Sequence, residues 1–180
     1  MILMSNFTAL EIQQSLKQMA LSKAPGPDGL PTLFFQKFWG VVGDKVIQAL
    51  LAVLNNGADI GEMSRAVVAL IPKVKSPIKI SDFRPISLCN VTYKLVAKVL
   101  ANRLKLVLND IIASSQSAFV PERLITDNVV VGFECLHHLN NRRKGSKGLA
   151  ALKLDMSKAY DRVEWVFLQK MMEKLSFDPC

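Results

Sequence analysis

The segment from Leu149 to Val163 constrains the fold most strongly, because an apolar run in it ends abruptly in a carboxylate. The run LAALKL suits one strand, and Asp155 follows it directly. An isolated ionised acid is expensive to desolvate, so a strand that ends in Asp155 predicts a use for that charge. A carboxylate beside backbone carbonyls is a good oxygen site for Mg²⁺. The alternative is that Asp155 only caps the helix expected after it.

The segment Ala24–Pro31 holds three prolines and two glycines in eight residues, which predicts a turn of fixed shape. Elsewhere, apolar periodicity and the capping-box spacing of Thr8 and Glu11 predict a helix-rich α+β chain. The expected helices cover residues 8–23, 33–39, 44–54, 91–109, 127–141 and 158–175. A short β-hairpin, with a buried first strand, is expected from residues 66–71 and 83–88. We interpret these elements as one compact unit.

The charge of the chain is one-sided. A formal net charge of +8 favours a polyanionic partner such as nucleic acid, although an ordinary basic protein has the same composition. The segment from Met63 to Asn109, called the basic block below, contains a single acid, Asp82. Its basic residues are Arg65, Lys73, Lys75, Lys79, Arg84, Lys94, Lys98, Arg103 and Lys105. The basic block is a credible phosphate-facing surface.

Within the basic block, the helix expected over residues 91–109 is amphipathic. Its lysines lie opposite an apolar face formed by Val96, Val99, Leu100 and Val107. Arg103 is the exception, because it projects from the apolar side. A snorkelling or salt-bridged arginine is the expected explanation.

The sequence argues against a secreted or membrane-spanning protein. Cys89, Cys135 and Cys180 are odd in number and widely spaced, which indicates neither a disulfide framework nor a zinc site. No signal peptide is visible, and no apolar run approaches the length of a membrane span. We therefore expect an intracellular protein, nuclear or cytoplasmic, with reduced thiols and no membrane partner.

Five segments in order carry a family resemblance: KAPGPDGLP, LIPK, DFRPISL, QSAFVPERLITDN and LKLDMSKAYDRV, which begin at Lys23, Leu70, Asp82, Gln116 and Leu152. Together the chain resembles the reverse transcriptase of plant non-LTR, LINE-type retroelements. The resemblance implies the fingers and the first part of the palm of a right-hand polymerase. Residues 1–148 would form a fingers-like region with an N-terminal extension, and residues 149–180 the beginning of the palm.

The family activity that the resemblance implies is RNA-templated DNA synthesis by two-metal nucleotidyl transfer. The implied partners are an RNA template, a DNA primer and deoxynucleoside triphosphates, and the implied cofactor is Mg²⁺. Asp155 matches the first catalytic aspartate of the palm and would bind metal, with the backbone carbonyl of Met156 as a further oxygen. Tyr160 matches the residue that resembles a steric gate against a 2′-hydroxyl. A core-facing helical tyrosine is compatible with that role, and Asp161 is expected to be structural.

The resemblance also assigns the basic and loop residues. Lys73 and Arg84 match the fingers residues that hold the incoming triphosphate, and a point charge beside a planar fork suits that task. Lys73 at a hairpin tip is equally explained as a solvated edge charge.

Template or primer contacts are implied for two further segments. The first is Lys23 with the turn that follows it, although a purely structural turn is about as good an explanation. The second is a loop in which Gln116, Phe119 and Arg123 match the family. Glu122 stands where the family often has a small residue, which weakens a phosphate contact for Arg123.

Two-metal chemistry needs several carboxylates that converge on ions about 4 Å apart. The later family motifs, an S-P-x-L-F…Q-G segment and an A-D-D turn, are absent from this sequence. We therefore expect a truncated reverse transcriptase with no detectable polymerisation on its own. The alternatives are a non-enzymatic nucleic-acid-binding module, in which Asp155 is only a cap, and a non-functional retroelement remnant.

Overall fold

The computed structural model describes residues 3–141, 148–156, 159 and 162–177. They divide into two compact units, Met1–Leu106 and Val107–Cys180, so the expectation of a single compact unit was wrong. The described chain is helix-rich with one two-stranded antiparallel sheet, which confirms the predicted α+β class. The fingers and palm assignment, with its boundary at residue 148, stays a prediction.

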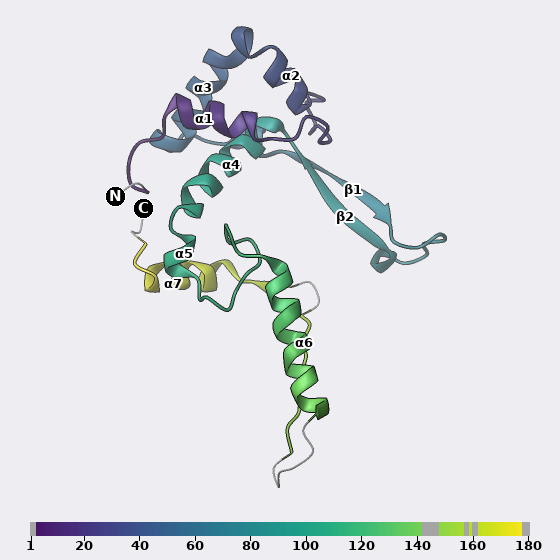
Figure 1. The fold of residues 1–180 in the computed structure, drawn as a ribbon. Coiled ribbons are helices and arrows are strands. Elements are labelled where there is room, and N and C mark those ends of the chain that lie inside the picture. Colours follow the sequence, from purple (N-terminus) through teal and green to yellow (C-terminus); the bar gives the residue numbers. More distant parts are fainter. Residues whose placement is uncertain (1–2, 142–147, 157–158, 160–161, 178–180) are drawn as a thin grey trace. The chain divides into compact units, whose positions relative to one another are not determined.

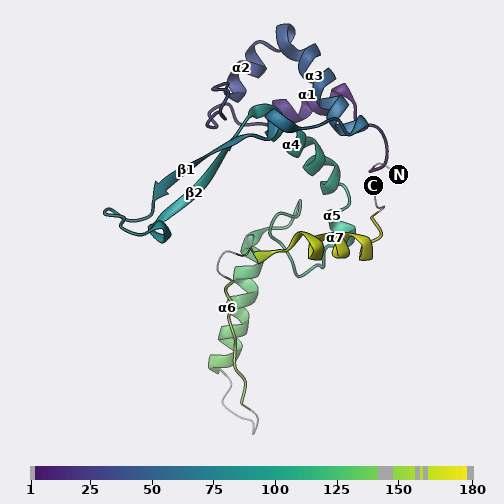
Figure 2. The ribbon, with the colours of Figure 1, turned by 180° about the vertical axis from the view of Figure 1, so that it is seen from behind.

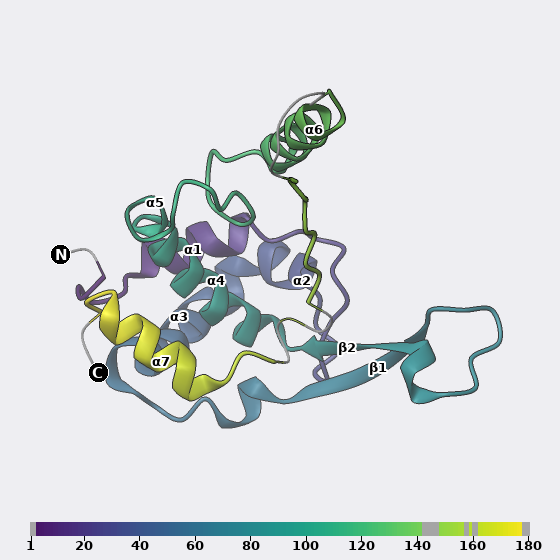
Figure 3. The same cartoon turned by 90° about the horizontal axis from the view of Figure 1, so that it is seen from below.

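The first unit is built from four helices that pack around a small apolar core (Figures 1 and 3). They are α1 (Ala9–Lys17), α2 (Thr32–Lys37), α3 (Trp39–Asn56) and α4 (Val91–Lys105). The core holds Ile12, Leu16, Phe35, Leu50, Val91, Leu95, Val96 and Val99. Half of these residues come from α4, so this helix organises the unit. Val96 and Val99 are buried as predicted, but Leu100 is 47% exposed.

The ends of α1 show why the sequence forms a helix there. The Thr8 hydroxyl accepts from the Glu11 amide at 3.3 Å, and the Glu11 carboxylate accepts from the Thr8 amide at 2.8 Å. This reciprocal pair confirms the predicted capping box. At the other end, the Gln36 side chain donates to the carbonyls of Leu16 and Met19 at 2.7 and 3.1 Å. Gln36 thus satisfies carbonyl groups at the C-terminal end of α1, which ends at Lys17 and does not continue to residue 23 as predicted.

Arg103 is buried on the apolar side of α4 and pairs with Glu11 of α1. Its Nε donates to one oxygen of Glu11 at 2.6 Å and its Nη2 to the other at 3.0 Å. The guanidinium also donates to the carbonyls of Ser5 and Asn6, and it stacks 3.5 Å from the ring centroid of Phe7. The salt-bridged alternative for Arg103 is thereby confirmed. The hydrogen bond from Arg103 lowers the pKa of Glu11 to about 2.

The predicted hairpin forms from β1 (Ala66–Pro72) and β2 (Phe83–Cys89), with Ala66 opposite Cys89 and Pro72 opposite Phe83. The short helices η1 (Gly61–Ser64) and η2 (Ile80–Asp82) precede the two strands. The hairpin extends away from the helices of its unit (Figure 2). The expectation of a buried first strand was wrong, because Val67, Val68 and Leu70 are each more than half exposed. Within the described chain these strands pair only with each other.

The second unit contains α5 (Leu108–Ile111), α6 (Ile125–Asn141) and α7 (Trp165–Lys174). Neither α6 nor α7 has a buried residue. The predicted helix at 127–141 is confirmed, and the last helix, expected over residues 158–175, spans Trp165–Lys174 among the described residues. No helix in the described ranges has the length and apolar composition needed to cross a bilayer.

The strand expected before Asp155 does not form in the described residues 148–156. Leu152 and Leu154, which would face the core of a sheet, are 82% and 83% exposed. A strand needs a neighbouring strand to satisfy its backbone groups, and no described residues supply one here. Apolar composition alone therefore did not determine the secondary structure of this segment.

Replacing Glu11 with Gln should lower the free energy of unfolding at neutral pH by about 2 kcal/mol, because Arg103 would stay buried without a counter-charge. The Glu11 side chain is 30% exposed, which makes the loss smaller than for a fully buried pair. Since folding lowers the pKa of Glu11, its contribution is complete above about pH 4.5 and is lost as the pH falls toward 2. Urea unfolding of both proteins from pH 7 to pH 2.5 measures this.

Glu62→Gln is the matched control, because it removes an ion pair with Arg65 in which both side chains are largely exposed. It should change stability little at any pH. A difference between wild type and Glu11→Gln that stays constant down to pH 2.5 would contradict the assigned role of the ion pair.

Candidate functional site

The distal end of the hairpin brings Lys73 and Arg84 together. Arg84 lies opposite Ile71 in the antiparallel register, and Lys73 directly follows Pro72, the last residue of β1. The two cations are therefore two register positions apart, and both are exposed. Lys73 donates its ammonium to the carbonyl of Ser81 at 2.8 Å. Among the described residues no hydrogen bond or ion pair engages the Arg84 guanidinium, which leaves its planar fork open to an anion.

Asp82, the sole acid of the basic block, lies at the same end of the hairpin. Its Oδ2 accepts from the amides of Ile78 and Lys79 at 3.0 and 2.9 Å. These bonds, that of Lys79 first, hold the pKa of Asp82 below its usual range. The carboxylate therefore binds backbone and forms no ion pair within the described residues.

The proline- and glycine-rich turn Ala24–Pro31 is fastened to the start of α4. Asn90 accepts from the Asp28 amide at 3.2 Å through its side-chain oxygen, and the Lys94 ammonium donates to the carbonyl of Ala24 at 2.8 Å. Asn90 holds the N-cap position of α4 but makes no cap bond to its own helix. Gly26 packs against Asn90 so closely that a Cβ would lie 2.3 Å from the Asn90 nitrogen. The structural alternative for this turn is thus supported, and the template role of the exposed Lys23 stays a prediction.

The predicted loop between α5 and α6 is held by Arg123. Its Nη1 donates to the carbonyls of Ala113 and Gln116 at 2.6 and 2.7 Å, and its Nη2 donates to that of Ile112 at 3.2 Å. Phe119 and Glu122 adopt left-handed backbone angles, with φ of 64° and 66°, and Phe119 is 82% exposed. The Arg123 guanidinium thus connects the two ends of the loop through its hydrogen bonds to backbone carbonyls. A template or primer contact by Gln116 or Arg123 stays a prediction.

Asp155 and Met156 are both exposed and lie in backbone without regular structure. Tyr160 and Asp161 fall outside the described residues, so the steric-gate assignment stays a prediction. Within the ranges that the structure describes, no three His, Cys, Asp or Glu residues come close enough to hold a metal ion. One carboxylate and one carbonyl have the right oxygen chemistry for Mg²⁺ but do not make a complete site. Lys73 and Arg84 belong to the other unit, so their proximity to Asp155 stays a prediction.

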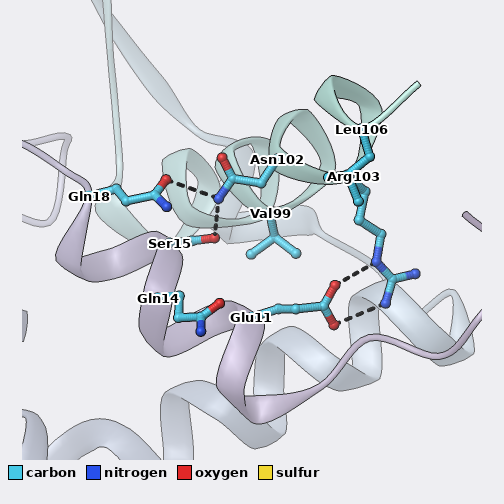
Figure 4. A pocket seen from close by; sticks show the side chains of 8 residues that line it. All are labelled: Glu11, Gln14, Ser15, Gln18, Val99, Asn102, Arg103 and Leu106. Carbon is cyan, nitrogen blue, oxygen red and sulfur yellow. Dashed lines mark hydrogen bonds and ion pairs between the residues drawn. The ribbon is translucent and has the colours of Figure 1, made fainter. Parts of the chain in front are cut away.

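A groove of about 310 Å³ lies between α1 and α4 (Figure 4). Its polar groups are largely paired with one another, because Asn102 donates to Ser15 at 3.0 Å and to Gln18 at 3.1 Å. The Arg103 and Glu11 ion pair closes one end (Figure 4). The groove therefore shows how α1 is fixed to α4, and none of the predicted site residues lines it.

Sequence reasoning missed two residues that shape the candidate site. Asp82 carried a signal, since it is the sole acid in a basic block. For Asn90 the sequence signal was misleading, because an Asn directly before a helix normally predicts a side-chain cap for that helix. Its actual partner, the Asp28 amide, lies 62 residues away in the chain.

The sequence also matches known proteins. Residues 71–180 match the family described as "Reverse transcriptase (RNA-dependent DNA polymerase)". The chain is 39% identical over 169 residues, 94% of its length, to the "Transposon TX1 uncharacterized 149 kDa protein" of Xenopus laevis. It is 28% identical over 80% of its length to the "Retrovirus-related Pol polyprotein from type-2 retrotransposable element R2DM" of Drosophila melanogaster. In each case the chain spans 13% of the relative's length.

Substituting Gly26 with Ala should lower the free energy of unfolding by about 1–3 kcal/mol, because the added methyl group overlaps the Asn90 backbone. The matched control is Gly40→Ala in α3, where an added methyl group would meet nothing within 4 Å. The control should stabilise the chain by about 0.5–1 kcal/mol through helix propensity. Chemical unfolding of both variants checks the two opposite signs, and a neutral Gly26→Ala would contradict the close packing.

Substituting Arg123 with Lys should loosen the loop while it keeps the charge, because one ammonium cannot reach three carbonyls in the same way. We expect amide exchange at Val120 and Arg123 to accelerate about tenfold, which corresponds to the loss of about one hydrogen bond. Arg162→Lys, at an exposed position in the same unit, is the control and should leave this exchange unchanged. Unchanged exchange in both variants would contradict the brace role of Arg123.

Proposed function

The chain belongs to the reverse transcriptase family, and we propose that it forms the fingers (residues 1–148) and the beginning of the palm (residues 149–180) of a retroelement RNA-directed DNA polymerase. The proposed activity of the whole enzyme is RNA-templated DNA synthesis from deoxynucleoside triphosphates and a DNA primer. The two relatives named above come from animals, so assignment to a plant LINE-type element remains a narrower prediction.

The observation that carries this proposal is the pair of exposed cations at the distal end of the hairpin. Arg84 offers an unpaired planar fork, and Lys73 supplies a point charge two register positions away. A triphosphate needs this combination, because guanidinium bridges two phosphate oxygens while an ammonium neutralises charge. The hairpin extends beyond the helical core, so a ligand at its tip meets no steric obstacle from the helices of the same unit (Figure 1).

Asp155 and the Met156 carbonyl are proposed as metal ligands of the palm. When bound, Mg²⁺ would orient and polarise the substrate phosphates. Tyr160 is proposed to select deoxynucleotides by crowding a 2′-hydroxyl. Lys23 and Gln116 are proposed to face the template or primer, with Arg123 acting through the loop shape.

A second candidate function is a non-enzymatic nucleic-acid-binding module. The basic block, which contains a single acid, favours it. Such a module would bind RNA with a steep dependence on salt and would show no preference for a free triphosphate.

Replacing Arg84 with Ala should weaken binding of dTTP with Mg²⁺ about tenfold or more, because a bidentate, charge-assisted contact is lost. RNA affinity should change only slightly, since one of many phosphate contacts disappears. Isothermal titration calorimetry with dTTP and with a single-stranded RNA measures the two affinities.

Arg65→Ala is the control, because it removes the same charge just before β1, at the other end of the hairpin. It should leave dTTP binding nearly unchanged. Equal losses of dTTP and RNA affinity in Arg84→Ala would favour the binding module over the polymerase assignment.

A further inference from the structure

We propose that Asp82 is a positioning residue that fastens the hairpin tip, so that Lys73 and Arg84 are presented together to a triphosphate. This inference rests on the proposed function of those two cations. Asp82, the sole acid of the basic block, would then strengthen binding of a polyanion, although its negative charge by itself would weaken that binding. Asp82 itself would touch no substrate.

The segment from Lys73 to Asp82 is closed at three points. The Lys73 amide donates to the Asp82 carbonyl at 2.7 Å, which extends the ladder beyond Pro72 and Phe83. The Lys73 ammonium donates to the Ser81 carbonyl at 2.8 Å. The Asp82 carboxylate accepts from the amides of Ile78 and Lys79 at 3.0 and 2.9 Å, which turns the chain back into β2. The carboxylate therefore holds residues 78 and 79 of the tip close to the start of β2.

The tip has little else to hold it. Ile78 and Ile80 are 90% and 85% exposed, so apolar burial contributes little to the stability of this segment. Lys73, Lys75 and Lys79 repel one another within a short stretch of chain. A two-stranded hairpin is only marginally stable by itself in water. Two charge-assisted bonds to backbone amides are therefore a substantial part of what orders the tip.

The bonds of Asp82 also distinguish positioning from charge balance. Both amides donate to the same oxygen, and within the described residues no lysine or arginine forms an ion pair with this carboxylate. The lowered pKa of Asp82 agrees, because the backbone bonds contribute most of it and Lys73 least. The ionised carboxylate is thus stabilised mainly by hydrogen bonds from backbone amides rather than by a neighbouring cation.

The two roles predict opposite signs. If Asp82 acted only through its charge, its removal from the basic block would strengthen binding of a polyanion. If Asp82 fastens the tip, its removal releases the segment between Lys73 and Arg84 and weakens binding of a triphosphate that needs both.

The experiment compares the 180-residue chain with its Asp82→Asn and Asp82→Ala variants, which remove the same charge but differ in hydrogen bonding. Asn keeps one acceptor oxygen for the two amides, whereas Ala keeps none. We expect dTTP affinity with Mg²⁺ to fall about tenfold in Asp82→Ala and by an intermediate factor in Asp82→Asn. Asp44→Asn, at an exposed position of α3, is the charge control and should not weaken binding.

Amide exchange at Ile78 and Lys79 without ligand tests the fastening separately, and it should accelerate in Asp82→Ala. Unchanged or tighter dTTP binding in both Asp82 variants would overturn the inference, as would unchanged amide exchange. If the wild-type chain binds no dTTP at all, the proposed nucleotide site fails, and amide exchange alone then decides whether Asp82 fastens the tip. Accelerated exchange in that case would identify the proposed function as the part that was wrong.

Discussion

The buried ion pair between Arg103 and Glu11 connects the two ends of the first unit in sequence. It joins α1 to α4 across 92 residues, and the same guanidinium binds the carbonyls of Ser5 and Asn6. Since α4 supplies half of the apolar core and directly follows β2, this pair fixes the N-terminal helix on the element from which the hairpin emerges. Burial of an arginine is tolerable here because its donors find a carboxylate, two carbonyls and an aromatic face.

The N-terminal end of α4 consequently positions two parts of the candidate site, the hairpin and the turn Ala24–Pro31. β2 joins it directly, and Asn90 and Lys94 fasten the turn Ala24–Pro31 beside that junction. The Asn90 side chain accepts a hydrogen bond from the Asp28 amide of this turn and makes no cap bond to its own helix. The hairpin tip is organised in the same way, because Asp82 and Lys73 bind backbone groups. Charged and polar side chains in this unit therefore do structural work, and Arg84 is left open for a ligand.

Much of the fold could be predicted from local sequence. The capping box at Thr8 and Glu11, the hairpin strands and the helix after Asn90 were all predicted, because each depends on neighbouring residues. The burial of the first hairpin strand and the strand before Asp155 were predicted wrongly, because burial requires a second layer and a strand requires a neighbouring strand. Of the candidate site, the placement of Lys73 and Arg84 on one hairpin was predicted and their role stays a prediction, whereas Asp82 and Asn90 gained their partners only in three dimensions.

The sequence alone determined the family, the order of the main helices and of the hairpin, and the surplus of positive charge, because motifs, periodicity and composition are properties of the chain itself. Tertiary structure decided which of those charges remain available. Arg103, Lys94 and Arg123 are engaged by Glu11 or by backbone carbonyls, whereas Arg84 is not. For Arg103 and Lys94 the physical reason is that their partners lie 92 and 70 residues away in the chain, and only the folded packing brings these groups together.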